Sequence, residues 1–146
     1  MLNEEKRADL LKDEYVMLQN FYEDIDSKGL TIKNWAITVA LASIGAGFVY
    51  HRKEILIAGF FASLVFWYLE AYWRGFSHFF SKRIQDIELA FQSEAWKEEL
   101  PLQVYSTWSR EYDKAGDQTR KYMLKKSSLL PHMVIALVYI PLYFLI

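Results

Sequence analysis

Residues 35–73 read WAITVALASIGAGFVYHRKEILIAGFFASLVFWYLEAYW, and this stretch decides the fold. It contains two apolar runs, at 35–50 and 55–73, separated only by the polar residues 51–54. Counted from Leu30, each run is about 20 residues long, enough at about 1.5 Å per residue to cross a hydrocarbon core of roughly 30 Å. Trp and Tyr bound both runs, as is typical of membrane interfaces. The stretch therefore predicts a transmembrane hairpin.

A third apolar run, at 129–146, closes the chain. Together the runs predict an all-α fold: an integral membrane helical bundle with a transmembrane hairpin, a third C-terminal span and cytoplasmic helices. The expected segments follow one another along the sequence. They are a cytoplasmic amphipathic helix at 1–29, the hairpin at 30–73, a cytoplasmic helical segment at 74–128 and the third transmembrane helix at 129–146.

Composition excludes several classes of function. The net charge is −1, so we expect no direct binding of nucleic acid. The chain has no cysteine, and its three histidines are far apart, so we expect no metal site. Nucleophilic triads, Gly-rich phosphate loops and paired catalytic carboxylates are absent from the sequence. We therefore expect neither an enzyme nor a cofactor. Residues 1–29 are polar and do not resemble a signal peptide, so the first run is expected to be an uncleaved anchor.

Lysine and arginine indicate the orientation. Residues 1–33 and 74–127 together carry 15 of them, whereas the hairpin turn carries only Arg52 and Lys53. The positive-inside rule therefore places the N-terminus and residues 74–127 in the cytoplasm, with the turn and the C-terminus outside.

The first helix is expected over residues 3–27, with an apolar seam that repeats at heptad spacing. We expect this seam to pack on the protein's own cytoplasmic helix or on a sister subunit, and hence predict a homo-oligomer. Gly29 is the expected end of this helix, and Thr31 the N-cap of the next. The expected oligomer seam is Leu11, Tyr15, Leu18, Tyr22 and Ile25.

Small residues four apart occur in both runs of the hairpin. Such pairs let two helices approach closely, and in lipid this packing drives association. They serve contacts within the hairpin, between subunits, or both. The expected packing residues are Ala36, Ala40, Ser43, Gly47, Ala58 and Ala62.

Beyond residue 73 the helical pattern continues to about residue 100, and Pro101 is expected to end it. Residues 102–128 predict a short helix, a turn at Gly116 and a second short helix. Pro131 is expected in the first turn of the third span, where its missing N–H costs nothing.

One face of the second run carries a polar ribbon that descends into the apolar segment. Within a bilayer these polar groups must contact something other than lipid. Their partner is either water in a pore or the other helices of the bundle. Glu70 is the residue of greatest interest, because ionisable groups within spans are expensive. It has a second interpretation, a pair with Arg74 at the interface. The expected pore-lining or gating residues are Gly59, Ser63, Phe66, Glu70, Arg74 and Ser77.

The chain resembles the membrane effectors of bacterial anti-phage operons. The resemblance lies in its small size, its lack of cysteine and its layout: a cytoplasmic helix, a tight transmembrane hairpin and a cytoplasmic helical extension. The layout is similar to that of the SLATT-type proteins and to that of the small channel subunits of nucleotidyltransferase-controlled systems such as Hailong. The resemblance implies a pore in the bacterial inner membrane that a cytosolic protein or nucleotide-type signal triggers, and that depolarises the cell.

Two functions follow as expectations. In the first, an oligomeric ion channel is lined by the second span and gated through its cytoplasmic helices. In the second, the same helices form a non-conducting membrane anchor or assembly subunit, which recruits a cytosolic partner through residues 84–125. A subunit of a larger transporter or enzyme complex is a further alternative.

Overall fold

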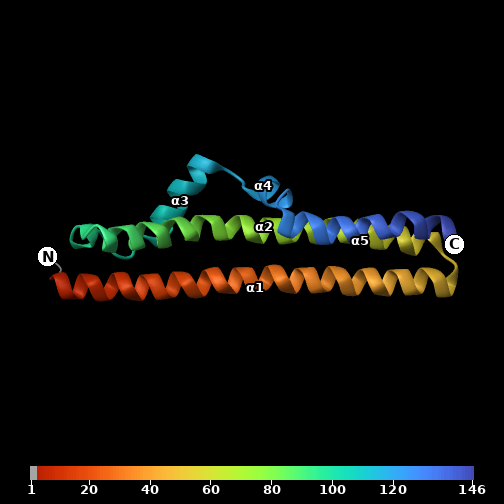
Figure 1. The fold of residues 1–146 in the computed structure, drawn as a ribbon, viewed down its shortest axis with the longest axis horizontal. Coiled ribbons are helices and arrows are strands. Elements are labelled where there is room, and N and C mark those ends of the chain that lie inside the picture. Colours follow the sequence, from red (N-terminus) through yellow and green to blue (C-terminus); the bar gives the residue numbers. More distant parts are fainter. Residues whose placement is uncertain (1–2) are drawn as a thin grey trace. The chain divides into compact units, whose positions relative to one another are not determined.

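The computed structural model describes residues 3–146, and Figure 1 shows its helices. Helices account for 88% of the chain, and residues 3–146 contain no strand, so the all-α prediction is confirmed. The elements are α1 (Glu4–Tyr50), α2 (Lys53–Gln92), the 3-10 helix η1 (Ala95–Lys97), α3 (Val104–Ala115), α4 (Thr119–Met123) and α5 (Lys126–Leu145).

The described chain divides into two compact units. The polar unit comprises residues 3–26 and 75–118, and the apolar unit comprises residues 27–74 and 119–146. Helices α1 and α2 contribute residues to both. Within the described chain, three helices are long and apolar enough to cross a membrane: α1, α2 and α5.

Helix α1 continues through Gly29, so the predicted helix end at this residue is wrong. Gly29 is buried, and the site of a missing Cβ lies 3.5 Å from Nε of Arg74. A glycine within a helix costs only about 1 kcal/mol, which this packing offsets. Thr31 is not an N-cap either, because its hydroxyl donates to the carbonyl of Ser27 within the continuous helix, at 3.0 Å.

The hairpin turn is as tight as the sequence predicts. Helix α1 ends at Tyr50 and α2 begins at Lys53. His51 adopts a left-handed conformation with φ of 51°, and the N–H of Arg52 donates to the carbonyl of Gly47 at 3.1 Å. This arrangement satisfies carbonyls that the end of α1 would otherwise leave unpaired.

The core of the apolar unit lies where α5 runs alongside α1 and the first half of α2 (Figure 1). Ala40, Leu56 and Tyr139, one from each helix, are buried together. The hydroxyl of Tyr139 lies 2.6 Å from Oγ of Ser43, so its polar end is satisfied inside the unit. Gly59 makes this approach possible, because a Cβ there would lie 2.2 Å from the same Oγ.

The polar unit has its own apolar core. Leu11 and Leu18 of α1 are fully buried against Ile84 and Ile87 of α2. The heptad seam therefore packs on the protein's own helix at these two positions, one of the two predicted arrangements.

Arg83 joins three segments of the polar unit. Its guanidinium donates to Glu14 at 2.9 and 3.2 Å, to Glu99 at 2.6 Å and to the carbonyl of Leu100 at 2.8 Å. The N–H of Leu102 in turn donates to Glu14 at 2.7 Å. Burial disfavours the charge, but hydrogen bonds and charges of the two carboxylates outweigh it and raise the pKa of Arg83.

Helix α2 ends at Gln92, so the prediction that it continues to about residue 100 is wrong. The hydroxyl of Ser93 donates to the carbonyl of Leu89 at 2.8 Å, and Glu94 follows in a left-handed conformation with φ of 59°. Local hydrogen bonding by a serine competes with the helix, and this signal precedes Pro101 by eight residues.

Helices α3 and α4 confirm the predicted short helix, turn at Gly116 and second short helix. Helix α5 begins at Lys126, which places Pro131 in the second helical turn rather than in the first as predicted. The proline therefore leaves the carbonyl of Ser127 without its usual donor four residues on. Nζ of Lys33 supplies one, at 3.0 Å.

Candidate functional site

A cluster of ionisable side chains lies at one end of the apolar unit. Glu70 of α2 is fully buried, and its carboxylate contacts side chains from three helices. Nε of Arg74 lies 2.8 Å from Oε1, and Nζ of Lys33 lies 3.3 Å from the same oxygen. Nε2 of His132 lies 2.8 Å from Oε2. We call Lys33, Glu70, Arg74 and His132 the Glu70 cluster.

The helices bring these residues together for separate local reasons. Glu70 and Arg74 are four apart on α2, so their side chains meet on one face, in the favourable order. Lys33 of α1 links Glu70 to the carbonyl that Pro131 leaves open at the start of α5. His132 follows Pro131 on α5, and its Nε2 lies against Oε2 of Glu70.

The cluster satisfies the buried carboxylate. An isolated ionised carboxylate inside an apolar unit is very costly, and pairing with hydrogen-bonding cations offsets that cost. Lys33 and Arg74 remain partly exposed, with side-chain exposures of 17% and 19%, so the cluster lies at the edge of the unit.

His132 is the least satisfied member of the cluster. Its Nδ1 is buried without a hydrogen-bond partner in the structure, while Nε2 faces Glu70. A neutral imidazole that donates from Nε2 leaves Nδ1 as an acceptor. Within residues 3–146, no group of three or more His, Asp or Glu side chains is arranged to hold a metal ion.

The predicted pore-lining residues are all buried or half-buried in the single chain. Gly59 lies against Ser43 and Tyr139, and Ser63 donates to the carbonyl of Phe60 at 2.7 Å. The remainder of the ribbon belongs to the Glu70 cluster or lies half-buried on α2. The sequence left two partners open for this ribbon, water in a pore or the other helices of the bundle. In the single chain, its own helices cover Gly59 and Glu70. The half-buried positions are Phe66, Arg74 and Ser77.

Most of the predicted packing residues face the interior of the hairpin. Ala36 and Ala40 are buried, and a Cβ on Gly47 would lie 2.7 Å from Cδ2 of Leu56. Ala58 differs, because it is exposed on α2. Ser43 and Ala62 are half-buried.

The predicted oligomer seam is partly covered within the chain. Leu11, Leu18 and Ile25 are buried, and Tyr15 is half-buried with its hydroxyl donating to Glu88 at 2.9 Å. Tyr22 is 40% exposed. The use of this seam between subunits stays a prediction.

Sequence reasoning missed Lys33 and His132 as members of the site. A signal was present, because one ionisable residue lies near the same expected membrane face for each apolar run: Lys33 just before the first, Glu70 in the second and His132 in the third. In a hairpin followed by a returning span, such residues lie at one level, so each is a candidate partner of the others.

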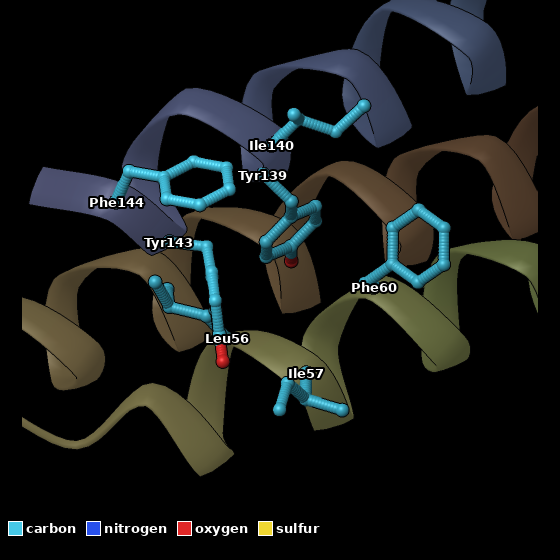
Figure 2. Close-up of a pocket in the computed structure, with 7 residues that line it drawn as sticks. All are labelled: Leu56, Ile57, Phe60, Tyr139, Ile140, Tyr143 and Phe144. Carbon is cyan, nitrogen blue, oxygen red and sulfur yellow. The ribbon is translucent and has the colours of Figure 1, made fainter. Parts of the chain in front are cut away.

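Both units have grooves on their surface, and two of these grooves differ in character. Figure 2 shows the first, an apolar groove of about 240 Å³ between α2 and α5, rimmed by aromatic rings. The second is a polar groove of about 600 Å³ in the polar unit, among the end of α2, η1 and the start of α3. Charged side chains from Asp86, Glu98 and Arg110 line it.

The two units differ in charge. The apolar unit carries nine Lys and Arg against the acidic residues Glu54 and Glu70, a net charge of +7. The polar unit carries eight Lys and Arg against sixteen Asp and Glu, a net charge of −8, and the two values sum to the −1 of the chain.

Comparison of the chain with protein-family models, with curated proteins and with solved structures finds no match.

Proposed function

We propose that the chain is an integral membrane protein whose apolar unit crosses the bilayer three times. The proposal is supported by large apolar side chains that lie exposed along all three helices of this unit. Leu41 is 66% exposed on α1, Phe61 60% on α2 and Leu137 53% on α5. An apolar exterior of this kind needs lipid or protein around it.

The spans run between two aromatic and basic ends. At one end Nζ of Lys28 lies 5.3 Å from the ring centroid of Trp73, and at the other Nζ of Lys53 lies 5.0 Å from that of Tyr143. The excess of Lys and Arg near the Glu70 cluster favours a cytoplasmic location for that end and for the N-terminus. The resemblance to defence effectors adds the bacterial inner membrane as the location.

Within this membrane setting, the geometry favours an anchor or assembly subunit that holds the acidic polar unit at the cytoplasmic face for a soluble partner. The burial of Glu70 carries this conclusion. Because Lys33, Arg74 and His132 satisfy its carboxylate inside one chain, the polar ribbon needs no water-filled pathway. The polar groove at the end of α2 offers the partner a charged surface.

An oligomeric pore is the second candidate, and a feature of α1 favours it. Side chains that face water in a ring of copies are exposed in the single chain. Within the apolar part of α1, Asn34 and Thr38 are exposed polar residues, and Ala42 and Gly45 continue the same face. Small and polar residues on one face promote helix association in lipid. This face, rather than Glu70, would then line the pathway.

Ion flux separates the two candidates. Liposomes that contain the purified full-length protein are expected to release potassium no faster than liposomes without protein. Potassium flux above that background would overturn the proposal of a non-conducting anchor. If the flux then falls in Asn34→Leu/Thr38→Val but not in Ser63→Ala, the proposal of a pore lined by α1 would replace it.

A further inference from the structure

Seven basic residues gather at the end of the apolar unit that holds the Glu70 cluster. Contacts place them at one level of the unit: Lys33 reaches the carbonyl of Ser127, and Gly29 packs on the side chain of Arg74. We call this set the basic band. Its members are Lys28, Lys33, Arg74, Arg120, Lys121, Lys125 and Lys126.

Within the apolar unit, basic residues outnumber acidic ones at the level of this band, and Glu70 pairs with two of its members, Lys33 and Arg74. Glu70 is the acidic residue of the unit at this level, and it is fully buried. Glu54, the unit's other acidic residue, lies at the hairpin turn. Within the apolar unit, the band therefore carries an excess of positive charge.

The start of α5 adds to this positive potential. Lys125 occupies the N-cap position, no side chain caps the helix, and its first turn has no acidic residue. Two lysines at a helix N-terminus are unfavourable, because the helix dipole is positive there. Arg120, Lys121, Lys125 and Lys126 are all exposed. An external anion would relieve the repulsion among these charges.

Apolar side chains adjoin the band directly. Leu30 is 53% exposed, Trp35 57% and Leu130 50%. Nζ of Lys125 lies 3.8 Å from the ring centroid of Tyr122, so this lysine of the band also contacts an aromatic ring. A soluble polyanion would match the charges but leave the apolar side chains in water. A phospholipid supplies both an anionic headgroup and acyl chains.

We propose that the basic band binds the headgroups of anionic phospholipids, and that the protein therefore prefers an anionic leaflet. The inference rests on the proposed membrane insertion. Juxtamembrane clusters of four to eight Lys and Arg attract anionic lipids in this way. The band has seven, four of which lie within residues 120–126.

The test measures the thermal unfolding midpoint of the full-length protein in neutral detergent with added lipid. Phosphatidylglycerol is expected to raise the midpoint by about 4 °C or more, and phosphatidylcholine much less. Raising NaCl from 50 to 500 mM should reduce the phosphatidylglycerol shift. Glycerol 3-phosphate, a headgroup without acyl chains, should not reproduce it.

Two matched variants locate the effect. Lys125→Gln/Lys126→Gln removes two charges from the band, and Arg52→Gln/Lys53→Gln removes two from the hairpin turn. Each pair includes one lysine that lies over a tyrosine ring. The first variant is expected to lose at least half of the phosphatidylglycerol shift, and the second to retain it.

Equal shifts with both lipids, an equal shift with glycerol 3-phosphate, or loss of the shift only in Arg52→Gln/Lys53→Gln would overturn the proposal. If the first variant does not fold, the salt dependence of the wild-type shift decides. Alkaline carbonate extraction separates this failure from that of the proposed function. A protein that stays in the membrane without lipid preference refutes only the basic band, whereas one that is released refutes insertion.

Discussion

At the scale of single residues, the buried carboxylate of Glu70 has partners on three helices: Lys33, Arg74 and His132. A lone acidic residue in an apolar run is expensive, and this alone identified the position as important. The i, i+4 spacing also identified Arg74 as a partner, which the structure confirms at 2.8 Å. Lys33 and His132 are 37 and 62 residues away in sequence, and no local pattern joins them to Glu70.

The number of partners changes what a substitution at Glu70 should do. An exposed Glu–Arg pair is worth only a few tenths of a kcal/mol. Glu70→Ala instead leaves Lys33, Arg74 and His132 without their shared carboxylate, and breaking a buried pair typically costs about 3–5 kcal/mol. We expect a clear fall in the thermal unfolding midpoint in detergent, whereas Glu54→Ala, at an exposed position, should leave it nearly unchanged.

The double variant Glu70→Ala/Arg74→Ala provides the sharper comparison. It should remain destabilised, because Lys33 and His132 still lack their partner. A double variant with the wild-type midpoint would mean that Glu70 serves only Arg74, contrary to the cluster described here.

At the scale of helices, the sequence predicted element types well and several element ends poorly. The hairpin turn was predictable because four polar residues interrupt an apolar stretch. Gly29 misled the prediction because a glycine ends a helix only where the backbone turns. Here the helix continues and the glycine admits the side chain of Arg74. Tertiary packing, which local propensity does not contain, decided this position.

Gly59 and Gly45 offer a matched test of the close approach in the apolar unit. A Cβ on Gly59 would lie 2.2 Å from Oγ of Ser43 and 2.5 Å from the hydroxyl of Tyr139, whereas one on Gly45 would meet nothing within 4 Å. Gly59→Ala should therefore destabilise the unit by about 1–3 kcal/mol through overpacking.

Gly45→Ala should be neutral in the single chain, or stabilising by up to about 1 kcal/mol through helix propensity. Thermal unfolding in detergent measures both changes. Equal midpoints for the two variants would contradict the contact of Gly59 with Ser43 and Tyr139.

At the scale of the whole chain, the two units carry opposite net charges, and the sequence reveals this only once the residues of each unit are known. Segments 1–26 and 75–118 are separated by the hairpin, so neither alone reveals a net charge of −8. The structure groups them, and the apolar unit is left with +7. The three apolar runs, by contrast, were evident from hydropathy, because a membrane-spanning helix requires an uninterrupted apolar segment.

Thiol labelling from the two sides of the membrane tests the proposal that the apolar unit is inserted in it. The chain has no cysteine, so one introduced thiol reports one position without background. With a membrane-impermeant maleimide applied to intact cells, Arg52→Cys should be labelled at once and Lys121→Cys only after the membrane is permeabilised. Labelling of both positions from the same side of the membrane would contradict the proposed three-span topology.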